Sequence, residues 1–181
     1  SQDVETDDNV MRQTSARLPW LLIGMLGGIG NSMILGNFDT TFAAHPEMAL
    51  YIPLIGGTGG NVGTQSSAII VQGLANSSLD AKDIFKQVAK EAVVAVINAT
   101  IISLLVYIYN FIRFGATATV TYSVSISLFA VVMFASIFGT LVPMTLEKLK
   151  VDPAIATGPF ISITNDIIGM LMYMGITVLL S

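Results

Sequence analysis

Long apolar stretches, separated by short polar and charged clusters, run along most of this chain. A helix needs about 20 mostly apolar residues to cross the hydrocarbon core of a bilayer. Five segments meet this requirement: 18–37, 48–75, 88–111, 121–146 and 154–180. The pattern therefore predicts an all-α membrane protein with five transmembrane helices.

The residues before and between these stretches are polar. Residues 1–15 form an acidic tail without the apolar core of a signal peptide, so we interpret them as the end of a linker and residues 16–181 as the membrane domain. The loop at 76–90 alternates charges and predicts a helical lead-in to the third span. Asp152 followed by Pro153 is typical of a helix start and predicts where the fifth span begins.

Basic residues gather on one side of the predicted membrane. If five spans alternate in direction, Arg113 falls on one side and the other seven basic residues fall on the opposite side. Those seven are Arg12, Arg17, Lys82, Lys86, Lys90, Lys148 and Lys150. Short loops rich in Lys and Arg stay in the cytoplasm. We therefore expect a cytoplasmic N-terminus and an external C-terminus.

Composition agrees with a membrane protein and narrows the chemistry. Of 181 residues, 53% are hydrophobic and 11% are charged, against about 25% charged in a soluble domain. The formal net charge is −4, and no basic patch indicates a nucleic-acid partner. The absence of cysteine excludes disulfides and thiolate metal sites, so a metal must use oxygen ligands or His45. We expect a multi-pass protein of the plasma membrane, which in a bacterium is the inner membrane.

The second span contains a run of glycine and polar residues at membrane depth, residues 55–67. An irregular backbone inside a bilayer is tolerated where it is buried in protein or lines a wet cavity, and glycine permits such a backbone. We therefore predict that the helix breaks here and lines a pore. The candidate pore-lining residues are Gly59, Gly60, Asn61, Thr64 and Gln65. Close helix packing is the alternative, since glycines four residues apart, at 56/60 and 59/63, are typical of helix contacts.

The fifth span contains Asp166, the one acidic residue deep in a predicted apolar segment. An ionisable group inside a membrane is costly and is a functional candidate by default. No basic residue is predicted at comparable depth to pair with it, and a protonated, hydrogen-bonded Asp166 is the remaining alternative. Helical spacing predicts one polar face with Asn165 beside it. That face comprises Gly158, Ser162, Asp166, Gly169 and Tyr173.

Two further carboxylates lie near the predicted cytoplasmic side. Glu91 opens the third span, where a place in the ion pathway and a plain interfacial role both stay open. Asp152 could line an entrance, although its position before Pro153 favours helix capping. Both are therefore candidates for the cytoplasmic side of a pathway.

The oxygen-rich residues suit a hydrated divalent cation. Mg²⁺ demands octahedral oxygen ligands and releases water reluctantly, so it meets proteins through one or two carboxylates and keeps several waters. In a two-fold symmetric dimer, two copies of Asp166 would flank such an ion, and oxygens of the second span would bind its water shell. Manganese, cobalt and nickel also occupy oxygen-lined sites, so the residues alone do not select one cation.

Several short motifs occur in the same order as in the MgtE magnesium channels, and the chain resembles that family over about residues 16–180. The motifs are Arg17-Leu18-Pro19-Trp20, Tyr51-Ile52-Pro53-Leu54, the run from Gly57 to Ser66, Lys90-Glu91, Pro143, Val151-Asp152-Pro153-Ala154, and Pro159 ahead of Asp166. They are specific in combination, whereas each alone is weak. Some members have asparagine in place of Gly158 and alanine in place of Ser162.

The resemblance implies a homodimer with five helices per subunit and a pore on the dimer axis, lined by the second and fifth spans. It also implies that Asp166 holds hydrated Mg²⁺ and that the protein is a transporter rather than an enzyme. Members usually have a cytoplasmic N domain and paired CBS domains that sense magnesium and close the pore. Residues 1–15 resemble the end of the segment that connects those domains to the membrane.

Two other functions stay open from the sequence. A sodium-coupled exchanger of divalent cations is the closest rival, and only flux measurements separate it from a channel. A structural role would follow if the glycine-rich span were a packing face alone. An intramembrane enzyme is disfavoured. An aspartyl protease needs two facing carboxylates, and the sequence has one deep Asp. A serine protease needs a His, and His45 is predicted in an outer loop.

Overall fold

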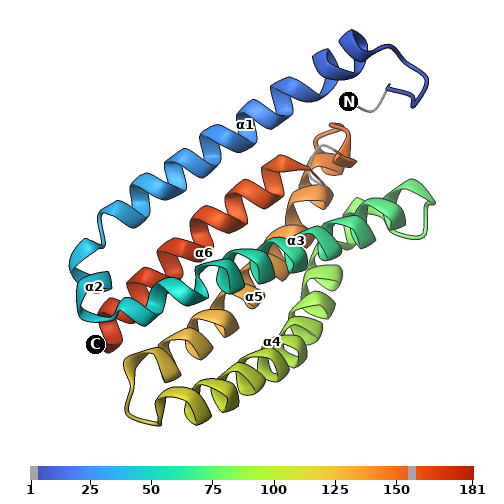
Figure 1. Cartoon of the computed structure of the whole chain (residues 1–181). Helices are drawn as coiled ribbons and strands as arrows, with labels where there is room; N and C mark the ends of the chain where they lie inside the picture. The colour runs from blue at the N-terminus through green and yellow to red at the C-terminus, as the bar shows by residue number, and fades with distance from the viewer. Residues whose placement is uncertain (1–3, 155–157) are drawn as a thin grey trace.

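The computed structural model describes residues 4–154 and 158–181, which form a bundle of long helices (Figure 1). The elements are α1 Val10–Gly36, α2 Asp39–Ala44, the 3₁₀-helix η1 Pro46–Tyr51, α3 Ile52–Ala75, the 3₁₀-helix η2 Ala81–Asp83, α4 Ile84–Phe114, α5 Thr119–Lys148 and α6 Pro159–Leu180. Successive long helices run in opposite directions, so the N-terminus and the α3–α4 connection lie at one end and the C-terminus and α2 at the other. The predicted all-α class is confirmed for the described residues.

Four of the described helices are long and apolar enough to cross a membrane. They are α1, α4 together with η2, α5 and α6. The other long helix, α3, has 24 residues, but its glycine and polar residues dilute its apolar content. The membrane crossing predicted for the second span, which α3 forms, therefore stays a prediction, although α3 lies among the other four helices (Figure 1).

The predicted break in the second span is wrong. Residues 52–75 form one uninterrupted α-helix, and none of the glycines between 56 and 63 has a positive φ. Each glycine in a helix costs about 1 kcal/mol relative to alanine, so contacts with neighbouring helices must offset that cost. Residues 48–51, predicted as part of the same span, belong instead to η1.

The fifth span also begins later than predicted. α6 starts with Pro159, where the missing N–H of proline has no helical partner to lose. Asp152 does act as a cap, because its Oδ1 accepts a hydrogen bond from the Ala154 backbone N–H at 3.0 Å, but it caps a short turn rather than the long helix. Residues 155–157, inside the predicted span, lie outside the described residues.

The core of the bundle is built around α5, which packs against α3, α4 and α6. Its buried side chains include Val124, Leu128 and Val131, which join Ile55 of α3 and Met170 of α6 in one apolar cluster. In contrast, α1 packs chiefly against α6 and has no buried residue. The outer surface of α1 is therefore not covered by the other described residues.

Two buried tyrosines fasten η1 to the end of the bundle. Tyr173 of α6 donates a hydrogen bond to the Met48 carbonyl at 2.8 Å, and Tyr51 donates one to Asn110 Oδ1 of α4. The Asn110 amide in turn donates to the Val120 carbonyl of α5 at 3.5 Å. The first two bonds hold the chain that leads into α3 against α6 and α4, and the third joins α4 to α5.

Candidate functional site

A polar cavity lies between α1, α3 and α6. It opens to the surface of the bundle and has a volume of about 440 Å³. Its lining comprises Asn31 of α1, Ile52, Gly56, Gly57, Gly60, Asn61 and Thr64 of α3, and Ser162, Asp166 and Met170 of α6. The cavity is the place where the glycine-rich helix meets the helix that contains the intramembrane carboxylate.

Asp166 is the one charged residue in this lining. Its side chain is half-buried, and no hydrogen bond or ion pair joins it to another described residue. The wall of α3 approaches it at Gly56, where a Cβ atom would lie 3.5 Å from Asp166 Oδ1. A carboxylate without a protein partner, close to hydroxyl and amide groups, can bind a cation or the water shell of one.

Five of the predicted site residues meet in the cavity: Gly60, Asn61, Thr64, Ser162 and Asp166. On α3 the spacing from Gly60 to Thr64 is one helical turn, as is the spacing from Ser162 to Asp166 on α6. The two polar stretches therefore face the same space. The binding of a metal by Asp166 stays a prediction.

Three other predicted pore-lining residues lie outside the cavity lining. Gly59 is buried against α5, where a Cβ atom would lie 2.9 Å from Val131 Cγ1. Gln65 is exposed but not part of the lining. Gly158 is the N-cap of α6, so it precedes the helix and cannot share a helical face with Ser162.

Asn165 lies behind the cavity rather than in its wall. Its side chain is 2% exposed and presses against Gly63, where a Cβ atom would collide with Asn165 Nδ2. Neither polar atom of this side chain has a hydrogen-bond partner in the part of the chain that the structure describes. Tyr173, predicted on the same face as Asp166, is buried beneath η1. The predicted polar face of α6 is therefore split between cavity and core.

The glycines of α3 divide between two faces of the helix. At Gly63 the backbone carbonyl oxygen would lie 2.7 Å from a Cβ atom placed on Gly139 of α5, so the two helices touch through their main chains. At Gly57 and Gly60 a Cβ atom would meet nothing within 4 Å. Close packing is thus confirmed for Gly59 and Gly63, while Gly57 and Gly60 border the cavity.

Five lining residues were not predicted from the sequence: Asn31, Ile52, Gly56, Gly57 and Met170. Gly56 and Gly57 belong to the glycine-rich run, and Met170 lies one turn after Asp166, so helical spacing could have identified them. Asn31 is a single carboxamide in an apolar span. A polar residue in an apolar span is visible in the sequence, but nothing in the sequence indicated that α1 lies beside α6.

Neither Glu91 nor Asp152 borders the cavity. Glu91 of α4 is half-buried, and its Oε1 accepts a hydrogen bond from Ser66 Oγ of α3 at 2.7 Å. This contact joins α3 to α4 on the side of α3 away from Asp166, since Ser66 is buried against Gly139 of α5. Asp152 is exposed and serves as the local cap described above.

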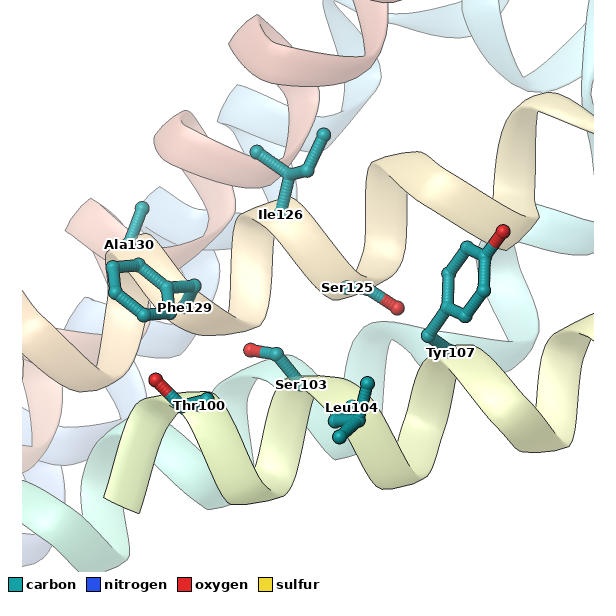
Figure 2. A pocket seen from close by; sticks show the side chains of 8 residues that line it. All are labelled: Thr100, Ser103, Leu104, Tyr107, Ser125, Ile126, Phe129 and Ala130. Atoms are coloured by element: carbon teal, nitrogen blue, oxygen red, sulfur yellow. The ribbon is translucent and has the colours of Figure 1, made fainter. Parts of the chain in front are cut away.

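A second hollow, between α4 and α5, has a different character (Figure 2). Leu104, Ile126 and Phe129 dominate it, and Figure 2 shows hydroxyl groups along the seam between the helices. Two of these hydroxyls donate to backbone carbonyls of their own helices, Thr100 to Val96 at 2.7 Å and Ser125 to Thr121 at 3.3 Å. With no charged residue in its lining, this hollow is a poor place for a cation.

The apolar helices of membrane-spanning length and the carboxylate-bearing cavity between them define a multi-pass helical membrane protein. Residues 52–176 match the family model MgtE, described as a divalent cation transporter. The chain belongs to this family, which confirms the resemblance found from its motifs. The matched region includes α3, α4, α5 and most of α6, and hence the α3 and α6 walls of the cavity.

Three relatives are each called magnesium transporter MgtE. The protein of Bacillus subtilis is 33% identical over 97% of this chain, that of Thermus thermophilus is 33% identical over 91%, and that of Enterococcus faecalis is 28% identical over 95%. The aligned regions cover 39%, 36% and 38% of the three relatives. The chain therefore spans less than two fifths of the length of these relatives.

Proposed function

We propose that this chain is the membrane part of a magnesium transporter, and that hydrated Mg²⁺ passes through the cavity beside Asp166. The observation behind this proposal is the carboxyl group of Asp166, which no described residue pairs, among neutral oxygen-bearing side chains of α3 and α6. The names of the relatives support magnesium as the transported ion. Their transport function also agrees with the expectation that the chain is not an enzyme.

The dimensions of the cavity suit an ion that keeps its water. Six waters of about 30 Å³ each occupy about 180 Å³, which is well below the cavity volume of about 440 Å³. One carboxylate and several neutral groups cannot replace six ligands of Mg²⁺, whereas they can accept or donate hydrogen bonds to its waters. We therefore infer an outer-sphere site in which Asp166 compensates charge.

A second copy of the chain completes the site in this proposal. Asn61, Thr64 and Ser162 are exposed beside the cavity, and polar groups facing lipid at membrane depth are unfavourable. In a two-fold symmetric homodimer these faces would cover each other, and two Asp166 carboxylates would balance the double charge of the ion. The pathway would then lie on the dimer axis between α3 and α6 of both copies.

The remaining features of the proposal concern the membrane. We place all five long helices across it, with α3 sheltered from lipid by its neighbours and by the second copy. The end of the bundle with the N-terminus, the α3–α4 connection and the end of α5 faces the cytoplasm, because seven basic residues belong to these segments. The plasma membrane is the location that fits such a transporter.

Flux measurements test the proposal. Liposomes containing the purified protein and a magnesium-sensitive dye should take up Mg²⁺, and Asp166→Asn should reduce the rate to that of empty liposomes. Asp152→Asn is the matched control, since Asp152 is exposed, lies outside the cavity, and asparagine also caps helix starts. Wild-type flux in Asp166→Asn would refute the proposed pathway. If Mg²⁺ flux stops when the sodium gradient is removed, the protein is a sodium-coupled exchanger rather than a channel.

A further inference from the structure

Asn31 is an isolated polar side chain in an apolar helix at the edge of the bundle. The segment around it, from Leu18 to Gly36, is otherwise apolar apart from Ser32. Helix α1 has no buried residue and packs chiefly against α6, so the carboxamide is not required to satisfy a polar core. Its presence needs another explanation, because polar groups are costly in a transmembrane helix.

The contact between α1 and α6 fixes where Asn31 lies. A Cβ atom on Gly27 would lie 2.6 Å from Ile163 Cγ2, so only glycine permits α1 to come this close to α6. The two helices run in the same direction (Figure 1). Asn31 follows Gly27 by one turn on the same face, and this places it level with the turn of α6 that contains Asp166. In agreement, Asn31 and Asp166 both line the cavity.

The carboxamide oxygen of Asn31 lacks a hydrogen-bond donor. Its Oδ1 is enclosed and makes no hydrogen bond with any residue that the structure describes. An enclosed polar atom without a partner is unfavourable, and a ligand that supplies a donor relieves that cost. The terminal torsion of asparagine is broad, so the carboxamide can turn its oxygen toward the cavity with little strain. A water molecule bound to a cation is a strong donor of this kind.

We infer that Asn31 is a specificity-determining residue of the cation pathway, which accepts a hydrogen bond from the water shell of a divalent cation across from Asp166. The inference rests on the proposed function, and it adds α1 to the helices that form the pathway. Asp166 supplies the charge, and Asn31 supplies a neutral acceptor at the same level. Together they suit an ion that keeps its inner waters, because one carboxylate and neutral groups cannot replace the six ligands of Mg²⁺.

The test compares Asn31→Leu with Ser32→Ala, a variant of the adjacent residue, which lies outside the cavity lining. Magnesium flux into liposomes is measured over a range of Mg²⁺ concentrations. Asn31→Leu should raise the half-saturating concentration about tenfold, the effect of losing one hydrogen bond. Asn31→Gln should restore part of the loss, and Ser32→Ala should behave as wild type.

One further measurement and the comparison with Asp166→Asn distinguish a failure of this inference from a failure of the proposed function. The oligomeric state of each variant in detergent is determined by light scattering. If Asn31 acted in assembly alone, Asn31→Leu would lower the fraction of dimer and the maximal flux together without changing the half-saturating concentration. That result would overturn the inference, as would wild-type saturation in Asn31→Leu while Asp166→Asn is inactive. If Asp166→Asn also transports normally, the proposed function itself fails.

Discussion

The main-chain contact between α3 and α5 makes Gly139→Ala a sharp test of the fold around the site. A Cβ atom at position 139 would lie 2.7 Å from the Gly63 carbonyl oxygen and 3.1 Å from Ser66 Cβ. Backbone atoms cannot rotate away as the end of a side chain can, so α3 and α5 must separate by several tenths of an ångström. Such overpacking costs about 1–3 kcal/mol.

The helix propensity of alanine partly opposes the destabilisation expected for Gly139→Ala. Alanine is favoured over glycine in a helix by about 1 kcal/mol, which offsets part of the steric cost. Because the clash is with the backbone, we take the upper end of the steric range and expect a net loss of about 2 kcal/mol in the free energy of unfolding. This corresponds to about a 30-fold fall in the ratio of folded to unfolded protein.

Unfolding by sodium dodecyl sulfate in mixed micelles, followed by circular dichroism, measures this change. Gly57→Ala is the matched control, since a Cβ atom there would meet nothing within 4 Å. The control should be as stable as wild type or more stable by up to about 1 kcal/mol. If Gly139→Ala unfolds at the wild-type detergent fraction, the close contact of α3 with α5 does not exist in solution, and the position of the cavity wall loses its support.

Two further variants test the contacts that hold α3 in place, by the same unfolding assay. Tyr51→Phe removes the donor to buried Asn110 Oδ1 and should lower the free energy of unfolding by about 1–3 kcal/mol. Tyr107→Phe is the control and should leave the free energy of unfolding unchanged, because the Tyr107 hydroxyl makes no hydrogen bond with a described residue. Ser66→Ala removes the hydrogen bond to half-buried Glu91 and should lower the free energy of unfolding by about 1–3 kcal/mol. If this variant is as stable as wild type, the contact does not contribute to stability.

Hydrophobic patterning predicted the helical class and most of the long helices, because a bilayer-spanning segment must be long and apolar. It could not predict how the glycines of α3 are used. Glycine permits both an irregular backbone and close helix contact, and the choice depends on which side chains the neighbouring helices present. The structure shows a regular helix whose Gly63 meets Gly139, a contact between residues far apart in the sequence.

The candidate site was predicted in the same uneven way. Asp166, Asn61 and Thr64 stood out because polar groups at membrane depth need a reason, and the structure brings them into one cavity. Asn165 has the same polar character, yet it is buried behind that cavity, since a one-residue step along a helix turns a side chain by about 100°. Asn31 was missed because the neighbour of a peripheral helix cannot be identified from its own periodicity.

The number of magnesium ions bound per chain tests the central claim most directly. Isothermal titration of Mg²⁺ into the purified protein in lipid nanodiscs should detect a site occupied by one ion for every two chains, and Asp166→Asn should remove that site. One ion per chain would contradict the paired carboxylates. Unchanged binding to Asp166→Asn would contradict the assignment of the cavity as the place where the ion is held.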